Sequence, residues 1–223
     1  MQKIVPISAY TAPKSQGFVH FTKRLFDLAL SLVMLILLAP VFIVLLLLSA
    51  LDTKSSPLFI QERCGRNNKP FRMYKFRTMK ASAPSDVATY ELKDPDQYMS
   101  GIGRLLRKLS LDELPQLINI LLGDMSFVGP RPVVLTETQL IRMRTRNGAN
   151  TVRPGLTGLS QVNGRDTVSI YRKARMDAQY AQKMSLRLDL SILLRTVTCV
   201  LASNGVEEGC NPNEDVQEAR YSV

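Results

Sequence analysis

An uncharged, leucine-rich run from Leu28 to Leu51 is the feature that most limits how this chain can fold. A helix needs about twenty apolar residues to span a bilayer, and this run has that length. No face of the run is polar, which argues against a helix buried in a soluble core. It begins well inside the chain and has no small-residue cleavage site at its end, so it does not fit a cleaved signal peptide. We therefore expect a membrane element at residues 18–55.

Ala39 and Pro40 interrupt this run near its middle. Pro40 has no N–H to donate to the Ile36 carbonyl and its ring crowds that turn, so a kink or break is expected there. Cations flank both ends of the run: Lys23, Arg24 and Lys54. The positive-inside rule places both flanks on the cytoplasmic side, which a re-entrant helix entering one leaflet and returning would satisfy. A simple span with a proline kink stays open, because membrane helices tolerate proline.

The charge and size of the chain restrict its partners. A length of 223 residues suffices for one substantial core, and the net charge of +10 implies an acidic partner. Nucleic acid, anionic lipid and a phosphorylated substrate are the ordinary candidates. Only the last two also explain the apolar run. The chain has no Trp, and its Phe and Tyr are scattered rather than placed among the cations for stacking on bases. We therefore expect no nucleic acid partner.

Cysteine and histidine usage excludes several kinds of site. Cys64, Cys199 and Cys210 have no paired spacing, so we expect three reduced thiols and neither a disulfide framework nor a zinc site. His20 is the only histidine and lies before the apolar run. Mechanisms built on a Ser-His or Cys-His pair are therefore disfavoured. Acid, base and nucleophile roles must fall to carboxylates or lysine.

The chain divides into a polar tail at 1–17, the membrane element at 18–55, one folded body at 56–203 and a second tail at 204–223. Leu58–Arg63 and Phe71–Met79 are typical of strands, and the Gly- and Asn-containing segment between them predicts a hairpin turn. Strand alternation places Lys75 and Arg77 on one face. Residues 80–97 are typical of a long loop or lid.

Apolar residues recur at helical spacing in two successive segments. Residues 102–109 alternate them with cations, which predicts a basic amphipathic helix suited to a lipid headgroup surface. Residues 114–122 repeat the pattern, and Gly123 can end that helix. For both, packing on an ordinary soluble core is the alternative. Two further helices are expected at about Thr167–Lys183 and Leu186–Ala202. The expected fold class is α+β, mostly helical, with a small β-hairpin and amphipathic interfacial helices around a site at the membrane surface.

Adjacent carboxylates, Asp112 and Glu113, lie at a predicted helix start. Ser110-x-x-Glu113 matches a capping box, so one interpretation is that these side chains only cap a helix. Pro115 favours moving the cap to Asp112, because a proline at the third helical position loses no needed N–H. In either case Asp112 would sit at a helix N-terminus, which favours its ionised form. An ionised aspartate can attack phosphorus and form an acyl-phosphate.

Such an attack on a diphosphate needs cations around the transferring oxygens. Four are candidates: Lys75, Arg77, Arg107 and Arg131. Arg131 lies between Pro130 and Pro132, which restrain the backbone and suit a phosphate clamp. A hard divalent ion such as Mg2+ would be held by one or two carboxylates, here Asp112 and Glu113, together with substrate phosphates.

Five motifs run between residues 21 and 205. They are Lys23-Arg24-x-x-Asp27, Tyr74-Lys75-Phe76-Arg77-Thr78-Met79, Ser110-Leu-Asp112-Glu113-Leu-Pro115-Gln116-Leu, Gly123-Asp124-Met-Ser-Phe-Val-Gly-Pro-Arg131-Pro132 and Arg153-Pro154-Gly155-Leu-Thr157-Gly158-x-x-Gln161-Val-Asn163-Gly164-Arg165. With these motifs the sequence resembles the bacterial sugar transferases called monotopic phosphoglycosyl transferases, which begin exopolysaccharide, capsule and glycan assembly.

The resemblance implies an enzyme on the cytoplasmic face of the bacterial inner membrane, held by a re-entrant helix in one leaflet, with residues 56–203 as its catalytic domain. It would transfer a sugar 1-phosphate from a nucleotide diphosphosugar, usually a UDP-sugar, to undecaprenyl phosphate and release UMP. Downstream glycosyltransferases are possible partners.

The resemblance also assigns roles to residues. Asp112 would be the nucleophile of a two-step, Mg2+-dependent reaction through an aspartyl-phosphosugar intermediate, and Glu113 would assist with metal and proton. Cations matching those of the family would serve the phosphates: Lys75, Arg107 and Arg131. The last motif would belong to the nucleotide-sugar side of the site, with Arg153, Thr157, Gln161, Asn163 and Arg165.

Two positions depart from the family pattern. Ala39 stands where many members carry Ser before the membrane proline, which bears on the turn in the membrane. Leu159-Ser160 stands where an aromatic is usual, which bears on the sugar or nucleotide pocket. A membrane hydrolase using the same acyl-phosphate chemistry and a non-enzymatic membrane scaffold are the alternatives. The sequence does not identify the sugar, the nucleotide or the oligomeric state.

Overall fold

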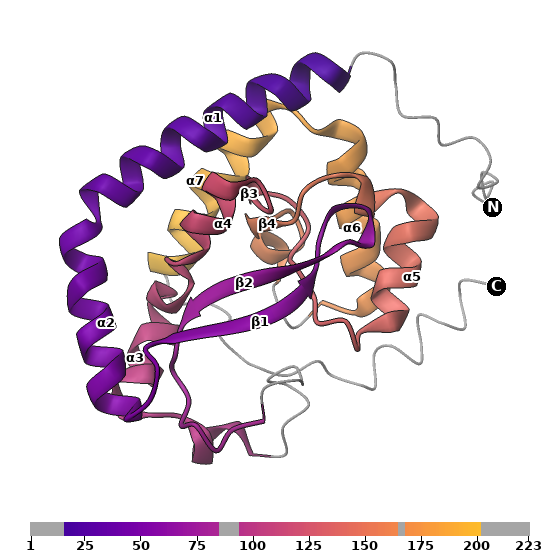
Figure 1. The fold of residues 1–223 in the computed structure, drawn as a ribbon. Coiled ribbons are helices and arrows are strands. Elements are labelled where there is room, and N and C mark those ends of the chain that lie inside the picture. Colours follow the sequence, from indigo (N-terminus) through magenta and orange to yellow (C-terminus); the bar gives the residue numbers. More distant parts are fainter. Residues whose placement is uncertain (1–15, 85–93, 165–167, 202–223) are drawn as a thin grey trace.

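The computed structural model describes residues 16–84, 94–164 and 168–201 (Figure 1). Its helices are α1 (Gln16–Leu37), α2 (Ala39–Thr53), α3 (Gly101–Lys108), α4 (Gln116–Leu122), α5 (Thr138–Asn147), α6 (Ile170–Lys183) and α7 (Leu186–Leu201). Its strands are β1 (Leu58–Cys64), β2 (Pro70–Phe76), β3 (Ser126–Val128) and β4 (Gly155–Thr157). The expected mostly helical α+β class is confirmed. Nearly all of the expected N-terminal tail, the whole C-terminal tail, Cys210 and the middle of the 80–97 loop lie outside the described residues.

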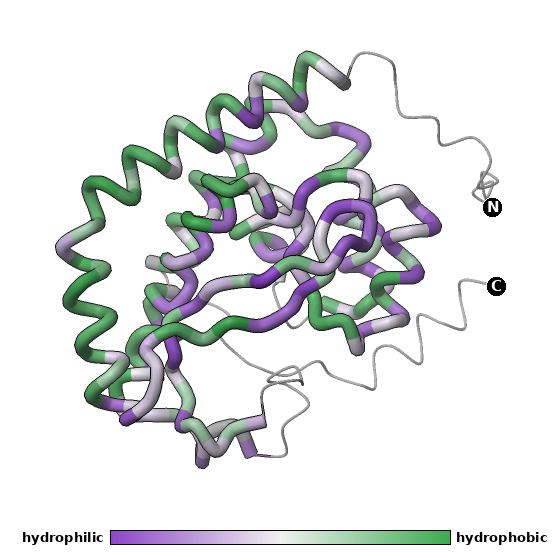
Figure 2. The backbone as a smooth tube through the Cα atoms, viewed as in Figure 1, coloured by the Kyte–Doolittle hydropathy of each residue, from purple (hydrophilic) through white to green (hydrophobic). Residues whose placement is uncertain are grey.

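Helices α1 and α2 form a bent arch along one side of the molecule (Figure 1). The bend between them is 67°. It lies at Leu38, and Ala39 and Pro40 are the first two residues of α2, so the predicted break is confirmed. Among the described helices, none alone is both long and apolar enough to cross a bilayer, whereas this bent pair together meets that test. Figure 2 shows apolar residues along most of the arch.

The predicted hairpin is present. β1 and β2 pair antiparallel, with Leu58 opposite Phe76 and Cys64 opposite Pro70. The second strand was expected to reach Met79 but ends at Phe76. Beyond it, the Arg77 N–H still donates to the Pro57 carbonyl at 2.8 Å in the same register, but Pro57 has no N–H to donate in return, and Met79 pairs with Met99 instead.

A short parallel pair and a helix were not predicted. β3 pairs with β4, with Ser126 opposite Gly155. The two segments approach so closely that a Cβ on Gly129 would lie 2.3 Å from the Arg153 carbonyl oxygen. Helix α5 lacks a clear apolar period, and its buried face carries Arg144 beside Leu140.

The main core lies beneath the hairpin, between β2, α4, β3 and α7. Its fully buried members include Met73, Leu117, Ile120, Val128 and Ile192. A second cluster joins the base of α2 to α3. In α3, Leu106 is buried in that cluster, whereas Leu105 and Leu109, the residue after the helix, are exposed. One face of this helix therefore packs on the core, and the other leaves apolar side chains at the surface. Gly123 ends α4 with a φ of 97°, as predicted.

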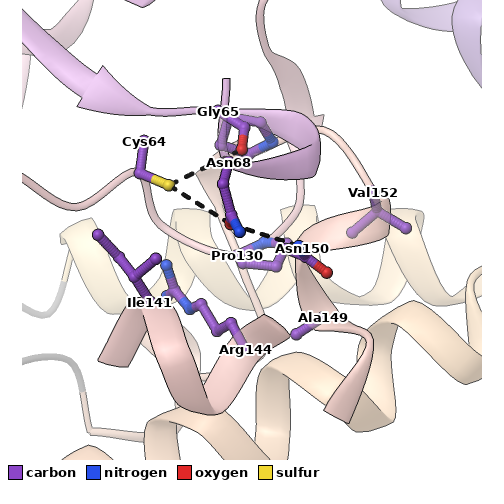
Figure 3. A pocket seen from close by; sticks show the side chains of 10 residues that line it. Cys64, Gly65, Asn68, Pro130, Ile141, Arg144, Ala149, Asn150 and Val152 are labelled. Atoms are coloured by element: carbon purple, nitrogen blue, oxygen red, sulfur yellow. Dashed lines mark hydrogen bonds between the residues drawn. The ribbon is translucent and has the colours of Figure 1, made fainter. Parts of the chain in front are cut away.

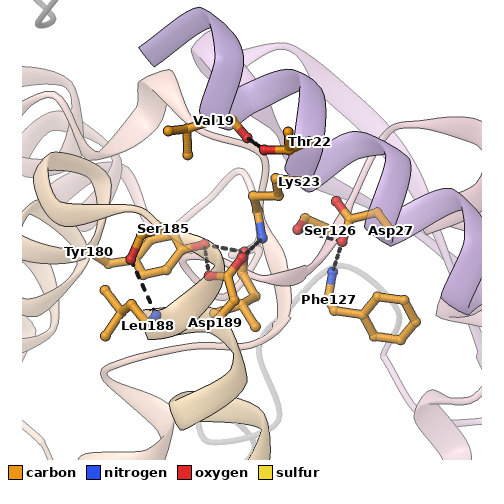
Figure 4. Close-up of polar contacts among 11 residues, drawn as sticks. Val19, Thr22, Lys23, Asp27, Ser126, Phe127, Tyr180, Ser185, Leu188 and Asp189 are labelled. Atoms are coloured by element: carbon orange, nitrogen blue, oxygen red, sulfur yellow. Dashed lines mark hydrogen bonds and ion pairs between the residues drawn. The ribbon is translucent and has the colours of Figure 1, made fainter. Parts of the chain in front are cut away.

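The inner side of α1 is held to the body by polar side chains (Figure 4). The Lys23 Nζ lies 2.6 Å from Asp189 Oδ2 of α7, and both residues are buried. The Tyr180 hydroxyl lies 2.8 Å from the other Asp189 oxygen and 2.8 Å from the Val128 carbonyl. Polar residues in an otherwise apolar helix therefore face the protein and fix α1 against α6, α7 and β3.

Asp27 makes a second connection of this kind. Its Oδ1 accepts from the Ser126 hydroxyl and from the Phe127 N–H, each at 3.1 Å (Figure 4). Asp27 is 1% exposed, so its carboxylate exchanges water for these two donors. The start of β3 is thereby tied to α1.

Candidate active site

The acidic pair lies in a tight turn rather than at the start of an α-helix. Residues 111–113 form a 3-10 turn after Ser110, whose φ of 55° is left-handed. Helix α4 begins later, with Pro115 at its N-cap and no side-chain capping bond. Both capping interpretations, with Ser110 or with Asp112 as the cap, are therefore wrong. The physical reason is that the Glu113 carboxylate is engaged by cations instead.

Glu113 is the meeting point of two cations. Its Oε1 accepts from Lys75 Nζ and from an Arg131 guanidinium nitrogen, each at 2.9 Å. The side chains of Lys75 and Glu113 are 17% and 16% exposed, whereas that of Arg131 is 43% exposed. The first contact is therefore sheltered, while Arg131 still reaches solvent and can meet a ligand.

Asn119 aligns the strand that carries Lys75 with the helix that follows the acidic turn. Its side chain accepts from the Tyr74 N–H at 3.0 Å and donates to the Arg72 carbonyl at 2.7 Å. Asn119 is fully buried, and these bonds satisfy both ends of its amide. A polar residue within the apolar pattern of α4 is the sequence signal that points to this role.

The segment that carries Arg131 is anchored from behind. The Pro130 carbonyl accepts from the Gly155 N–H at 2.9 Å, and the Arg131 carbonyl accepts from Arg144 at 2.8 Å. Arg144 is itself paired with Asp177 of α6 at 2.7 Å, with both residues buried. The expected rigid placement of Arg131 thus has a physical basis, although nothing in the sequence pattern identified Arg144 or Asp177.

The two carboxylates differ in their electrostatic environment. Burial raises the pKa of Asp112 to about 6, against the opposing effect of Lys75, and the charge of Glu113 adds to the rise. Burial also acts to raise the pKa of Glu113, but Arg131 and Lys75 outweigh it and lower that pKa. Asp112 is 7% exposed, and within the described part of the chain its carboxylate accepts no hydrogen bond. At neutral pH it is mostly ionised, and no described residue donates a hydrogen bond to it.

The other cations expected at the site divide into two groups. Arg107 and Arg131 lie close enough to Asp112 to stabilise its charge, and Arg107 also donates to the Thr78 hydroxyl at 2.9 Å. Arg77 is placed elsewhere. It donates to the Ser56 carbonyl at 2.8 Å and lies over the Phe59 ring at 5.7 Å. The structure therefore brings Lys75, Arg107 and Arg131 to the acidic pair but not Arg77.

The described residues of the last motif form their hydrogen bonds away from the acidic pair. Arg153 donates to the Gly123 carbonyl at 2.8 Å, and Thr157 shares a hydrogen bond with Thr196 at 2.7 Å. Gln161 donates to the Leu156 carbonyl at 3.1 Å, and Asn163 to that of Leu159 at 2.7 Å. Arg165 lies outside the described residues.

A small hollow lies behind the Arg131 segment (Figure 3). The hairpin turn, α5 and residues 149–150 line it, and Arg144 points toward it. Its polar groups bond to one another, since Asn68 accepts from Asn150 at 3.3 Å and from Cys64 at 3.8 Å. Neither acidic residue lines this hollow. It is therefore part of the support for the site rather than its opening.

The donor set can accommodate a hard cation only together with a ligand. The described residues contain no group of three or more histidine, cysteine, aspartate or glutamate side chains suited to hold a metal. Mg2+ commonly takes one or two carboxylates plus substrate phosphates, and Asp112 and Glu113 provide two. Both described bonds to Glu113 end on Oε1. The pair thus fits Mg2+ that arrives with a phosphorylated substrate.

Residues 18–203 match the family model described as bacterial sugar transferase. This match covers most of the chain. The chain belongs to the bacterial sugar transferase family.

Individual members of the family agree with this assignment. The uncharacterized sugar transferase EpsL of Bacillus subtilis is 39% identical over 186 residues, which are 83% of this chain and 90% of EpsL. The exopolysaccharide production protein ExoY of Sinorhizobium fredii is 37% identical over 217 residues, covering 89% of this chain and 95% of ExoY. A UDP-glucose:undecaprenyl-phosphate glucose-1-phosphate transferase of Caulobacter vibrioides is 38% identical over 200 residues, covering 86% of this chain and 74% of that protein.

This bacterial sugar transferase is an enzyme that transfers a group, as the five motifs predicted. The scaffold alternative, in which the acidic pair only caps a helix, is excluded by the same finding and by the absence of capping bonds at the described turn.

Proposed function

We propose that this sugar transferase moves a sugar 1-phosphate from a UDP-sugar to undecaprenyl phosphate and releases UMP. The observation that carries the proposal is a buried aspartate, free of hydrogen bonds among the described residues, next to a glutamate held by two cations. A carboxylate beside fixed positive charge suits an attack on a diphosphate. The name of the Caulobacter relative states the same reaction class for glucose.

The first step is a displacement at phosphorus. An Asp112 carboxylate oxygen attacks the phosphorus that bears the sugar, the bond from that phosphorus to the bridging oxygen breaks, and the bridging oxygen leaves with UMP. The product is an aspartyl-phosphosugar. In the second step an undecaprenyl phosphate oxygen attacks the same phosphorus, which restores the Asp112 carboxylate and yields the lipid-linked diphosphosugar.

The surrounding cations balance the charge that moves during these steps. Arg107 and Arg131 are positioned to bind phosphate oxygens, and Arg131 has the exposure to do so. Lys75 and Glu113 hold each other, so Lys75 contributes its charge from a fixed position. Preorganised charge of this kind lowers the barrier because it needs no rearrangement during the reaction.

Mg2+ is part of the proposal. Asp112 and Glu113 would hold it together with the donor diphosphate, and it would supply further charge neutralisation at the phosphates. The residues Arg153, Thr157, Gln161 and Asn163 remain a prediction for the donor side. Arg77 and Arg165 remain predictions without a described contact to the acidic pair.

We further propose that α1 and α2 enter one leaflet and return, with the body on the cytoplasmic face of the bacterial inner membrane. The 67° bend supports this, as do the cations at both ends of the pair. The outward side of the arch is apolar and exposed, through Phe18, Phe21, Leu25, Leu32, Val33, Ile36, Leu37, Val41, Ile43, Val44, Leu47 and Leu51. A patch of this extent on a monomer marks an interaction with lipid or another apolar surface.

One assay tests the reaction. The purified full chain is incubated with Mg2+, a panel of UDP-sugars and undecaprenyl phosphate, and UMP and lipid-linked sugar are measured. We expect both products, in equal amounts, with at least one donor. UMP formed without lipid would identify a hydrolase instead, and no turnover with any nucleotide sugar would contradict the proposal.

A trapping experiment tests the intermediate. Donor labelled in the phosphate next to the sugar is added without undecaprenyl phosphate, and the polypeptide is separated and counted. Label on the native chain but not on Asp112→Asn would support the covalent step. Turnover with no labelled polypeptide at any time would favour direct transfer between the two substrates.

Cysteine labelling tests the topology. Single cysteines are introduced within residues 1–17 and near Lys54, on a background without the native thiols, and are probed with an impermeant reagent in sealed inverted vesicles. A re-entrant pair requires that both positions react from the same side. Labelling from opposite sides would establish a span.

A further inference from the structure

A second group of cations lies apart from the acidic pair, around the end of α4. Arg24 of α1 donates to the Ile120 and Leu121 carbonyls at 2.6 and 2.9 Å. Arg153 donates to the carbonyl of the next turn residue, Gly123, at 2.8 Å. A Cβ on Gly123 would lie 3.2 Å from the Arg24 guanidinium. The two arginines therefore flank one helix end from two sides.

Arg66 and His20 complete the group. Arg66, in the hairpin turn, donates to the Thr151 carbonyl at 2.7 Å, two residues before Arg153. Arg66 and Arg153 are both close enough to His20 to interact electrostatically with it. Arg66 is exposed, and Arg24, His20 and Arg153 are half-buried. Residues distant in sequence thus meet at one place on the surface.

Positive charge at this place exceeds what its structural contacts need. The carbonyls at the end of α4 favour one or two cations. Within the described residues, Arg24, Arg66 and Arg153 form no ion pair with a carboxylate. Asp27 is close enough to favour the charged form of Arg153, but one carboxylate does not balance three arginines. Burial, followed by Arg24 and Arg66, lowers the pKa of Arg153, as expected for cations that repel one another.

Nitrogen atoms remain for a ligand. The described bonds of Arg66 and Arg153 use only their Nε atoms, so their terminal guanidinium nitrogens make no hydrogen bond to the described protein. Guanidinium groups gathered at one place, with N–H groups left over, suit a tetrahedral oxyanion.

We propose that Arg24, Arg66 and Arg153, with His20 beside them, form a binding site for a phosphate group that is separate from the acidic pair. The exposed apolar side chains next to it favour a phospholipid headgroup as the source. Phe21 and Leu122 are 67% and 64% exposed, and they neighbour Arg24 and Gly123 in the chain. A phospholipid whose phosphate lies between these arginines would have its acyl chains beside this apolar surface. The proposed reaction does not require this site, although Arg153 is also one of the residues predicted for the donor side.

Lipid binding to the full chain in a non-ionic detergent tests the proposal. Phosphatidylglycerol and phosphatidylcholine are titrated separately, and bound lipid is measured by native mass spectrometry. The variants are Arg66→Gln and Arg66→Gln with Arg153→Gln. The matched control is Arg142→Gln, which removes another exposed arginine, on α5. Circular dichroism checks that each variant is folded.

We expect native chain and Arg142→Gln to bind phosphatidylglycerol equally. Arg66→Gln should bind it about fivefold more weakly and the double variant about 25-fold more weakly, since one cation near an anionic lipid surface contributes about 1 kcal/mol. Sodium pyrophosphate, titrated in the same way, distinguishes the sources. Binding of pyrophosphate alone, weakened by the same variants, supports a site filled by a soluble phosphate. Equal binding of both probes by native chain and double variant overturns the proposal.

Discussion

The interface between α1 and α7 and the acidic turn each contain a lysine–carboxylate pair, buried at the interface and half-buried at the turn, but the two differ in what surrounds the carboxylates. At the interface, Lys23 and Tyr180 occupy both oxygens of Asp189. At the turn, Lys75 and Arg131 share one oxygen of Glu113, and Asp112 beside it has no hydrogen-bond donor among the described residues. At the interface, both carboxylate oxygens therefore have partners within the protein.

This difference separates holding a fold from acting on a ligand. A buried pair whose groups are all bonded fixes two elements and has no capacity left for a substrate. A buried carboxylate without donors destabilises the folded state. A protein retains such a carboxylate where the group has a chemical task. The comparison predicts that substitutions at the interface change stability and that substitutions at the turn change the reaction.

Asp112→Asn gives the largest expected effect. Turnover should fall by about 10⁴-fold or more, because an amide cannot attack phosphorus and loss of a nucleophile has effects of this size. The thermal unfolding temperature should stay the same or rise, since the substitution removes a charge that burial disfavours. Activity within tenfold of the native chain would remove Asp112 from its assigned role.

Lys23→Met should act on stability. It leaves Asp189 charged and buried with only Tyr180 as a partner, which costs about 3–5 kcal/mol and lowers the unfolding temperature by roughly 6–20 °C. Lys23→Met combined with Asp189→Leu is the control, and it should recover most of the loss because no unpaired charge remains. If both variants were equally destabilised, packing rather than charge would explain the effect.

The acid limb of the pH–rate profile should report Asp112. Its raised folded-state pKa means that the reactive, ionised form is lost as pH falls through about 6, so kcat/KM should decline tenfold per pH unit below that point. Glu113, whose pKa is lowered, stays ionised over this range. In Glu113→Gln the inflection should move down by roughly one unit, because the neighbouring negative charge is gone.

The shift must be measured on kcat/KM from pH 5 to 8 with both chains, since overall activity also falls when Glu113 is lost. An inflection that stays in place in Glu113→Gln would mean that another group limits the rate at low pH.

Tyr180→Phe gives the smallest expected effect. It removes the hydroxyl between Asp189 and the Val128 carbonyl and should cost about 1–2 kcal/mol of unfolding free energy with little change in turnover. Denaturation monitored by circular dichroism provides the measurement. A large loss of turnover in a folded Tyr180→Phe would join the interface to the reaction and weaken the comparison.

Local patterns predicted the elements that depend on local chemistry. Pro40 predicted the break, because a missing N–H acts within one helical turn. Alternating residues around a Gly- and Asn-containing turn predicted the hairpin. The motif containing Asp112 and Glu113, with Lys75 and Arg131, predicted which residues the fold would bring together.

Long-range contacts explain what was missed. The β3–β4 pairing joins two three-residue segments, too short to show a pattern of their own. Helix α5 buries Arg144 because Asp177, from another helix, neutralises it, and no local signal announces that partner. The capping box failed for the same reason, since Lys75 and Arg131 compete for the Glu113 side chain from outside the turn.

The contact at Glu113 also has a consequence for how the molecule becomes active. Lys75 comes from the hairpin, which precedes Glu113 in the chain, and Arg131 comes from the segment after β3, which follows it. A chain that has formed only its first half holds the lysine and lacks the arginine. The complete site therefore requires both the hairpin and the segment after β3 to be in place.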